Sequence, residues 1–245
     1  MRKLKLNPRL WRRLWGTRAT KDRVWTGGSL AENFYVKLGY ASRQNPEYYF
    51  DEPAAGVTWQ PMVYPFAAER AVQRGCDTIV DIGCGRAQKL ARLWEEHPSW
   101  KFIGIDYGNN IQWCTNNHKF GTWIESDLEK PGSLIKDRDL EKALVICSDV
   151  VEHLVFPGPL LDRIHLLLEQ GAREAIISTP ERDLTRGIDD FGPPKNSCHV
   201  REWNSQEFRA LLEAWKFRVD HLGLTRSNDA EPHERTILAV VSRQI

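Results

Sequence analysis

The sequence predicts an α/β fold, a doubly wound and mostly parallel sheet of seven strands with helices on both faces. Short runs of β-branched residues recur from about residue 62 onward, and segments with helical periodicity lie between most of them. Alternation of this kind is typical of βαβ units, which build parallel sheets. The 245 residues, of which 41% are hydrophobic, are enough for one such domain with a buried core.

Seven runs are the candidate strands and five segments are the candidate helices. The strands are expected at 78–82, 102–106, 122–126, 144–148, 175–179, 217–222 and 236–241. The helices are expected at 64–73, 87–96, 110–117, 159–169 and 205–215. Right-handed crossovers bring the loops after parallel strands to one edge of the sheet, where ligands bind. We therefore expect functional residues directly after the strands.

The chain divides into three predicted segments. Residues 1–29 are a basic, amphipathic extension, with nine Lys or Arg and a single acid between Arg2 and Arg23. We expect this extension to dock on its own domain, and the alternative is peripheral contact with an anionic membrane surface. Residues 30–61 are an aromatic-rich cap, and residues 62–245 are the main ligand-binding domain.

The composition indicates in which cellular compartment the protein works and which kinds of partner it binds. The net charge of +1 gives no overall argument for nucleic acid, and no apolar run is long enough to span a bilayer. Five cysteines without a Cys-x-x-Cys pair indicate reduced thiols rather than a disulfide framework. We expect a cytoplasmic protein, with the inner face of the membrane as the alternative location through the basic N-terminus.

A glycine-rich loop follows the first predicted strand. Gly83 and Gly85 allow a tight turn and close approach to a ligand, and Asp106 lies 21 residues after Gly85, at the end of the second strand. A dinucleotide site would want a third glycine where this chain has Gln88. Asp81 would repel a pyrophosphate but suits a ligand with an ammonium and a sulfonium group. The charges therefore favour S-adenosylmethionine over NAD.

Four motifs resemble those of class I, Rossmann-like methyltransferases: VDIGCG, FIGIDYG, WIESDLE and LVICSDVVEHL. The resemblance runs over residues 80–241 and implies a seven-stranded sheet whose last strand is antiparallel. It also implies that residues 62–245 are an S-adenosylmethionine-binding methyltransferase domain. The cofactor-binding residues that it implies are Asp81, Gly83, Gly85, Asp106, Asp127 and, as a neighbour, Ser148.

A second cluster is expected beside the methyl donor. Asp149, Glu152 and His153 follow the fourth strand at i, i+3 and i+4, so their side chains would converge on a helical turn. His199 comes from the loop after the fifth strand and would join them at the same edge. The cluster resembles the Glu-x-x-Glu-His motif of small-RNA 2′-O-methyltransferases and the strand-end motif of ubiquinone-biosynthesis O-methyltransferases. Asp149 stands where the former have their first Glu.

Three interpretations of this cluster remain open. In the first, Asp149, Glu152, His153 and His199 bind Mg²⁺, Mn²⁺ or Zn²⁺, which would activate a hydroxyl group of the acceptor. In the second, His153 or His199 is a general base and Glu152 orients it. In the third, the motif only packs beside the cofactor. All three favour an oxygen acceptor over nitrogen, because an alcohol needs proton removal or metal activation and a neutral amine needs less.

The acceptor is expected to be a sugar. STPERD, the Gly-Pro loop after it, HVREW and ERTILAVV resemble bacterial methyltransferases of surface polysaccharide and glycan synthesis. Arg182, Arg186 and Arg201 would recognise an anionic acceptor, or else pair with loop carboxylates. Tyrosines of the segment 45–64, Tyr48 and Tyr49 among them, would stack on a ring or pack as a lid.

Other functions compete with methylation of a glycan hydroxyl. The alternatives are O-methylation of a small phenolic or secondary metabolite and O-methylation of RNA. Nucleic acid is the less favoured partner, because basic residues are concentrated at the N-terminus. An NAD-dependent sugar oxidoreductase is a distant alternative, which the missing third glycine and the lack of a Tyr-x-x-x-Lys pair disfavour.

Overall fold

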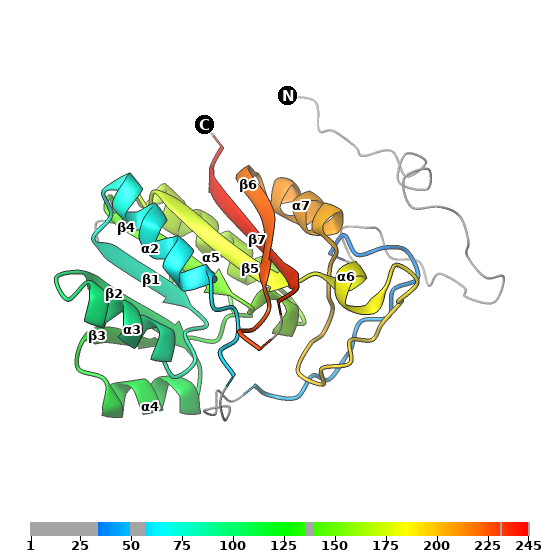
Figure 1. Ribbon diagram of the computed structural model, residues 1–245, viewed down its shortest axis with the longest axis horizontal. Coiled ribbons are helices and arrows are strands. Elements are labelled where there is room, and N and C mark those ends of the chain that lie inside the picture. The colour runs from blue at the N-terminus through cyan, green and yellow to red at the C-terminus, as the bar shows by residue number, and fades with distance from the viewer. Residues whose placement is uncertain (1–33, 50–56, 136–139, 231, 245) are drawn as a thin grey trace.

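A seven-stranded sheet organises the computed structural model, which describes residues 34–49, 57–135, 140–230 and 232–244 (Figure 1). The strands are β1 (Thr78–Ile82), β2 (Lys101–Asp106), β3 (Gly121–Glu125), β4 (Ala143–Ser148), β5 (Glu174–Pro180), β6 (Phe217–Arg226) and β7 (Glu234–Arg243). Their order in the sheet is β3-β2-β1-β4-β5-β7-β6. β1 to β5 are parallel, and β7 runs antiparallel to both β5 and β6. The predicted fold class is confirmed.

All seven predicted strands form, and the last two are longer than expected. β6 and β7 pair with each other from Phe217 opposite Arg243 to Arg226 opposite Glu234. The predicted run 236–241 is the buried centre of β7, and the predicted run 217–222 is the first part of β6. The ends that the hydrophobic pattern missed are held by the antiparallel pairing of the two strands.

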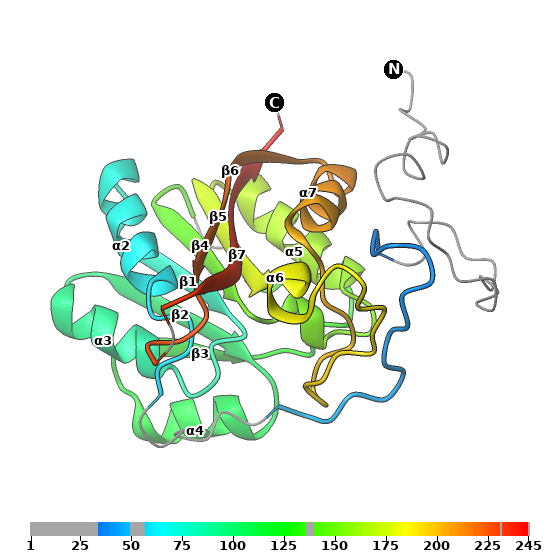
Figure 2. The same cartoon turned by 45° about the vertical axis from the view of Figure 1, so that its right-hand side comes forward.

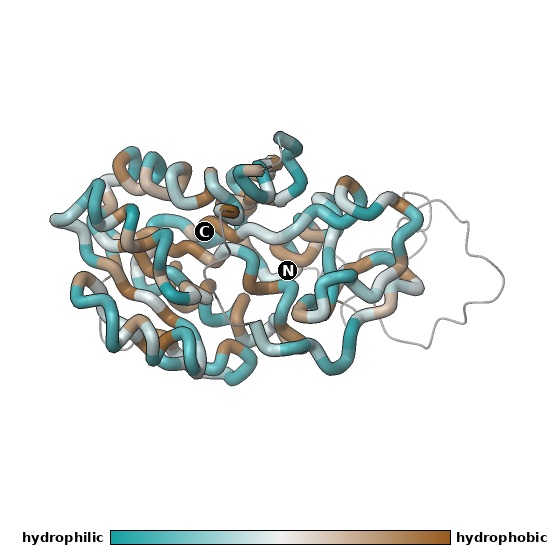
Figure 3. The backbone as a smooth tube through the Cα atoms, turned by 60° about the horizontal axis from the view of Figure 1, so that its bottom comes forward, coloured by the Kyte–Doolittle hydropathy of each residue, from teal (hydrophilic) through white to brown (hydrophobic). Residues whose placement is uncertain are grey.

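The helices cover both faces of the sheet (Figures 1 and 2). The main ones are α2 (Val63–Arg74), α3 (Gln88–Glu96), α4 (Asn109–Asn117), α5 (Gly158–Glu169) and α7 (Ser205–Ala214). Residues of α2, α3 and α4 pack into one hydrophobic cluster, and residues of α5 and α7 pack into another. Adjacent residues of β1 divide between the clusters, Ile79 in one and Val80 in the other, as the two-residue period of a strand requires. Figure 3 shows hydrophobic stretches, in brown, alternating with hydrophilic ones, in teal, along the backbone.

Two short helices lie outside the five predicted helical segments, although a helical turn was expected after the fourth strand. The 3-10 helix η1 (Val151–His153) follows β4, and α6 (Arg182–Arg186) follows β5, where a polar loop was expected to begin. The Glu181 side chain caps α6 by accepting a hydrogen bond from the Leu184 N–H at 2.7 Å. One turn of helix has too few residues to show a period, so only the cap could have indicated it.

Residues 34–49, the longer of the two described parts of the cap segment, pack along the loop between α6 and α7. Backbone hydrogen bonds join Ala41 to Phe191 at 2.8 Å and Arg43 to Val200 at 2.8 Å. The predicted extension 1–29 lies outside the described residues, so its docking on the domain stays a prediction. Within the described ranges, no helix has the length and apolarity to cross a membrane.

Candidate active site

The predicted site residues gather at the edge where β1, β2, β4 and β5 have their carboxyl ends. β1 lies between β2 and β4 in the sheet, so the chain leaves it toward one side and later returns on the other. Ligands of open α/β sheets bind at such a switch point. The loops after these four strands carry the cofactor-loop glycines, Asp106, the η1 turn and His199.

The glycine loop has a backbone that only glycine adopts easily. Gly83 and Gly85 have φ angles of 74° and 56°. A Cβ atom at Gly83 would lie 2.3 Å from a methyl group of Val150, so a side chain there would clash with the turn after β4. The Gly85 N–H donates to Asp106 Oδ2 at 2.7 Å, which joins the loop directly to the end of β2.

Asp81 is a buried carboxyl group at the floor of this edge. It is 1% exposed, accepts a hydrogen bond from the Tyr64 hydroxyl at 2.8 Å, and has a second oxygen without a partner among the described residues. Burial raises the pKa of Asp81 to about 7, although the Tyr64 hydrogen bond and the Lys89 charge oppose the shift. A cationic ligand beside Asp81 would favour the ionised form.

Asp127 and Ser148 also lie at strand ends. Asp127 accepts the Glu129 N–H at 3.0 Å and pairs with Lys130 at 3.1 Å. Burial alone would raise the pKa of Asp127, but these two contacts outweigh it and the pKa is lowered. The Ser148 hydroxyl lies 2.9 Å from the Ser178 hydroxyl, so it is held at the end of β4.

Glu152 is fully buried in the η1 turn. Its Oε2 accepts a hydrogen bond from the Thr179 hydroxyl at 3.0 Å, whereas Oε1 has no partner among the described residues. Burial and the neighbouring Asp149 carboxylate raise the pKa of Glu152 well above that of an ordinary carboxyl group. A buried negative charge here therefore calls for a cation or a proton.

The structure brings His153 and His199 together with Glu152. The two imidazole centroids are 4.7 Å apart with planes at 85°, although the residues are 46 positions apart in the chain. One ligand atom from each of the three side chains can be chosen so that all lie within 4.8 Å of one another. The Val200 N–H donates to the Glu152 carbonyl at 2.7 Å and joins the two loops.

Both imidazoles are oriented through Nδ1. His153 Nδ1 lies 3.1 Å from the Cys198 carbonyl oxygen, and His199 Nδ1 lies 2.7 Å from Glu202 Oε1. Burial and the neighbouring His199 lower the pKa of His153 to about 3, so this ring is neutral at pH 7. With its Nδ1–H donated to a carbonyl, the neutral ring keeps a lone pair on Nε2.

Asp149 is not a member of the three-residue group. The helix begins only at Val151, and Asp149 has a φ of 53°, so the i, i+3, i+4 geometry predicted for the turn is wrong. The Asp149 carboxylate instead accepts hydrogen bonds from the Ser178 hydroxyl, at 3.0 Å, and from the Gln60 side-chain amide. The predicted set of four metal ligands is thereby reduced to three.

Glu202 and Gln60 were missed as site residues. The spacing of His199 and Glu202, three residues apart, is a signal for their contact, but the carboxylates of this loop were expected to pair with its arginines. Gln60 comes from the cap, 89 positions from Asp149, and no sequence pattern connects the two.

The loop arginines are mostly structural. Arg182 is fully buried and pairs with Asp183 and Glu207, and Arg186 pairs with Asp190 at 2.8 Å. Pairing with a loop carboxylate was the alternative expected for them, but Arg182 is buried rather than solvated. Arg201 donates to the carbonyls of Leu154 and Val155, and burial lowers its pKa to about 10.

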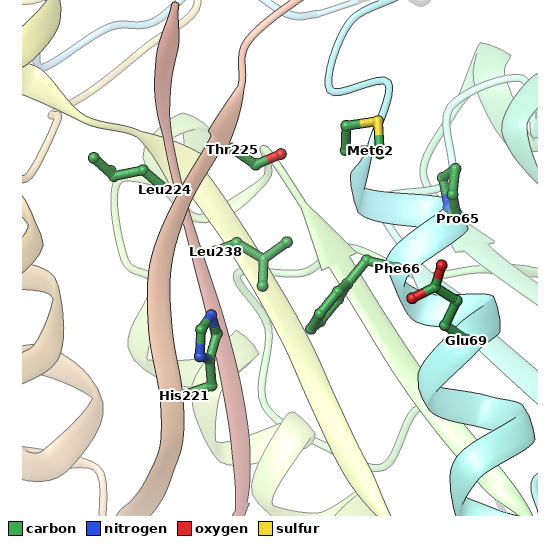
Figure 4. A pocket seen from close by; sticks show the side chains of 8 residues that line it. All are labelled: Met62, Pro65, Phe66, Glu69, His221, Leu224, Thr225 and Leu238. Carbon is green, nitrogen blue, oxygen red and sulfur yellow. The ribbon is translucent and has the colours of Figure 1, made fainter.

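A hollow of about 180 Å³ lies apart from these residues, between α2 and the β6–β7 ribbon (Figure 4). Its lining side chains include Phe66, Leu224 and Leu238. None of the predicted cofactor or catalytic residues lines it, so it is not part of the candidate site.

The sheet order, the antiparallel last strand and the acid-flanked glycine loop define a class I S-adenosylmethionine-dependent methyltransferase fold. Residues 50–222 match the family described as "Methyltransferase domain", and the chain belongs to this family. S-adenosylmethionine is the methyl donor of these enzymes, so the oxidoreductase alternative no longer stands. A search of curated proteins found no match.

Solved structures share the fold at low sequence identity. The small RNA methyltransferase HEN1 has a TM-score of 0.58 and 19% identity over 80% of this chain, which spans only 27% of the HEN1 chain. The methyltransferase domain of bacterial CtHen1-C has a TM-score of 0.55 and 19% identity, with 76% of this chain and 98% of that chain covered. A methyltransferase from Clostridium acetobutylicum ATCC 824 has a TM-score of 0.56 and 12% identity, with 77% and 93% covered.

Proposed function

We propose that this methyltransferase transfers the methyl group of S-adenosylmethionine to a hydroxyl group of a sugar, in the synthesis of a polysaccharide or other glycan. The observation that carries the proposal is the group of buried Glu152, buried His199 and half-buried His153 at the cofactor edge of the sheet. A hydroxyl group is a weak nucleophile until its proton is removed or its oxygen is polarised. The group supplies acceptors for that proton or ligands for a metal ion.

The reaction places defined demands on these side chains. A bond forms between the acceptor oxygen and the methyl carbon while the bond from that carbon to the sulfonium sulfur breaks, and the hydroxyl proton must leave. Glu202 holds the His199 ring by its Nδ1, and the Cys198 carbonyl holds the His153 ring by its Nδ1. The Nε2 of His153 is thereby oriented for an acceptor or a metal ion, whereas the Nε2 of His199 lies 3.0 Å from the Asn196 side-chain amide nitrogen, a contact that an acceptor or a metal ion at this atom would displace.

The three side chains fit a divalent metal ion. The orphan oxygen of buried Glu152 and two neighbouring imidazoles make a set of one oxygen and two nitrogen ligands. Imidazole suits Zn²⁺ better than Mg²⁺, whereas a carboxylate suits Mg²⁺ and Mn²⁺, so this set favours Zn²⁺. Once bound, such an ion would lower the pKa of the acceptor hydroxyl.

A metal-free mechanism would depend on His199. With a pKa of about 3, His153 is too weak a base to take a proton efficiently at neutral pH. His199 has the carboxylate partner that a general base needs, because Glu202 lies 2.7 Å from its Nδ1. The two mechanisms therefore differ in whether His153 is essential.

RNA is the second candidate acceptor. The fold similarity to a small RNA methyltransferase favours it. Against it, residues 34–245 carry 25 Lys or Arg and 31 Asp or Glu, a net charge of −6. A polyanion binds where cations are concentrated, so a sugar without phosphate suits this part of the chain better.

Transfer of labelled methyl groups from S-adenosylmethionine tests the proposal. The acceptors are bacterial polysaccharides, lipid-linked sugars, phenols and small RNA, each assayed with and without a chelator. We expect label in a carbohydrate, loss of activity on chelation, and recovery with Zn²⁺, Mn²⁺ or Mg²⁺. His153→Ala and His199→Ala should each abolish transfer, while the exposed His233→Ala should not. Label confined to RNA or phenols would refute the sugar assignment, and activity after chelation would leave His199 as the base.

A further inference from the structure

An exposed tyrosine lies against the imidazole cluster. The Tyr49 ring centroid is 5.5 Å from that of His153, with the planes tilted by 47°. Tyr49 is nevertheless 46% exposed, so much of its surface faces solvent beside the candidate catalytic group.

The backbone around Tyr49 is fixed at two points. We call residues 47–49 the strap. At one point, Glu47 binds the loop between α6 and α7, because its N–H donates to the Ser197 carbonyl at 3.1 Å and its carboxylate accepts the Ser197 hydroxyl at 2.6 Å. At the other, the Tyr48 hydroxyl donates to the Tyr107 carbonyl at 2.8 Å, directly after Asp106.

The two tyrosines of the strap therefore reach opposite ends of the site. Neighbouring residues of an extended chain point in opposite directions. Tyr48 reaches the end of β2, where Asp106 raises its pKa further after burial has done so, and Tyr49 reaches His153. Tyr49 is thus on the acceptor side of the strap, away from the end where the adenosine is expected.

The chemistry beside Tyr49 suits a neutral ring. The faces of aromatic rings are electron-rich and attract the weakly positive C–H groups of a pyranose. Arg182 and Arg186, which would otherwise favour an anionic acceptor, are held in ion pairs with Glu207 and Asp190. No third arginine of the loop adds a free charge, since Arg201 is buried against backbone carbonyls.

We propose that Tyr49 is the platform on which a pyranose ring of the acceptor stacks, which turns one of its hydroxyl groups toward Glu152, His153 and His199. The inference rests on the proposed function and adds the subsite that recognises the sugar. It makes Tyr49 a specificity-determining residue for a neutral ring, and it assigns no such role to Tyr48.

Binding of simple sugars tests the platform without requiring methyl transfer. The probes are the methyl pyranosides of glucose, galactose, mannose and rhamnose at millimolar concentration, with S-adenosylhomocysteine saturating. Saturation-transfer NMR should show contacts to the ring C–H protons of at least one pyranoside. Tyr49→Ala should weaken this binding roughly tenfold, whereas Tyr49→Phe, which keeps the ring, should stay within about threefold of the wild type.

Tyr107→Ala is the matched control, because Tyr107 is a comparably exposed tyrosine (50%) that offers only its backbone carbonyl to the strap. It should leave pyranoside binding unchanged, and all variants should keep their affinity for S-adenosylhomocysteine. Three results would overturn the inference: unchanged sugar binding in Tyr49→Ala, no contact of any pyranoside with the wild type, or contact with uridine or adenosine instead. If pyranosides bind through Tyr49 but no carbohydrate is methylated, the proposed function fails and the platform stands.

Discussion

Asp81 and Glu152 are both buried carboxyl groups with one oxygen that lacks a hydrogen-bond partner in the described ranges. A buried oxygen without a hydrogen bond lowers the free energy of unfolding. For each of the two residues, burial is the main reason why the pKa is raised. The two groups lie on different strands of the same sheet edge, β1 and the turn after β4. We interpret both as binding sites for a positive charge. Asp81 would bind the cationic part of the cofactor, and Glu152 would bind a cation or a proton beside the acceptor.

The pH dependence of cofactor binding should report Asp81. The pKa of about 7 in the free protein should fall when the cationic cofactor binds, so the complex holds fewer protons than the free protein. Affinity for S-adenosylmethionine should therefore rise with pH and gain roughly tenfold between pH 6 and pH 7.5. Calorimetry in buffers of different ionisation enthalpy would measure both the affinity and the released proton.

Two variants separate Asp81 from other causes of this pH dependence. Asp81→Asn should bind weakly at all pH values and release no proton. Asp106→Ala should bind more weakly by about 1–3 kcal/mol, the scale of hydrogen bonds to a charged group, yet keep the pH dependence. A pH dependence that persists in Asp81→Asn would assign the proton to another group.

Glu202 should matter for metal binding although it is not one of the three ligands. It fixes the His199 ring through Nδ1, and groups that orient a ligand in this way typically change metal affinity by about 10- to 100-fold. Glu202→Gln should weaken Zn²⁺ binding by that factor, as followed by competition with a chelating dye. Glu213→Gln, on the exposed side of α7, is the control. Equal Zn²⁺ affinities for Glu202→Gln and the wild type would contradict the assigned role.

At the scale of the elements, Glu207 joins three parts of the chain. Its carboxylate accepts hydrogen bonds from the Lys37 N–H of the cap, from Arg182 of α6 and from the Asn204 N–H at the start of α7. Glu207 and Arg182 are both fully buried. The loop that carries His199 lies between α6 and α7, so this junction anchors both of its ends.

Breaking that junction should destabilise the fold. Glu207→Gln leaves the fully buried Arg182 guanidinium with the Asp183 carboxylate alone, and removing one partner of a buried ion pair costs about 3–5 kcal/mol. Glu213→Gln breaks only an exposed pair with Arg209 and should change the free energy of unfolding by less than about 1 kcal/mol. Urea unfolding measures both, and a similar effect of the two substitutions would show that the junction contributes little.

The sequence predicted elements well and contacts between distant segments poorly. All seven strands and the five longer helices carry several turns or alternations, so their periods are visible. α6 and η1 are single turns and show no period. The hydrogen bond from Gln60 to Asp149 and the bonds from the cap to Phe191 and Val200 join residues about 90 to 160 positions apart, and no local pattern encodes them.

The same distinction applies to the candidate site. Asp81, Gly83, Gly85 and Asp106 could be placed because the alternation of strands and helices brings their loops to one edge. The contact of His153 with His199 followed from that edge as well. The position of Asp149 could not be predicted, because its φ of 53° and the 3-10 geometry after it replace the regular turn on which the spacing argument depended.

At the scale of the whole molecule, charge is divided along the chain. Residues 1–33 carry nine Lys or Arg and two Asp or Glu, a net charge of +7, whereas residues 34–245 carry −6. A near-zero total thus conceals two regions of opposite sign. Such a basic segment is expected to bind anionic membrane surfaces, and each Lys or Arg near the surface contributes about 1 kcal/mol to the free energy of binding.

Removal of residues 1–24 should separate anchoring from catalysis. The truncated chain should keep its affinity for S-adenosylmethionine, because every predicted cofactor residue lies beyond position 80. Its binding to vesicles containing anionic lipid should fall and lose its sensitivity to salt, with vesicles of neutral lipid as the control. Loss of folding on truncation would instead place the leucines and tryptophans of this segment in the core.

The strap, hydrogen-bonded to the rest of the protein at Glu47 and at Tyr48, also predicts the order in which the cofactor and the acceptor bind. A cofactor seated on Asp106 would have to pass the hydrogen bond from Tyr48 to Tyr107, whereas an acceptor beside the half-exposed Tyr49 would not. The methyl donor would then enter first and its demethylated product would leave last. Product inhibition distinguishes this order: S-adenosylhomocysteine should compete with S-adenosylmethionine and not with the acceptor. Tyr48→Phe, which removes the hydrogen bond to the Tyr107 carbonyl, should speed up cofactor release, and the cofactor and the acceptor should then bind in random order.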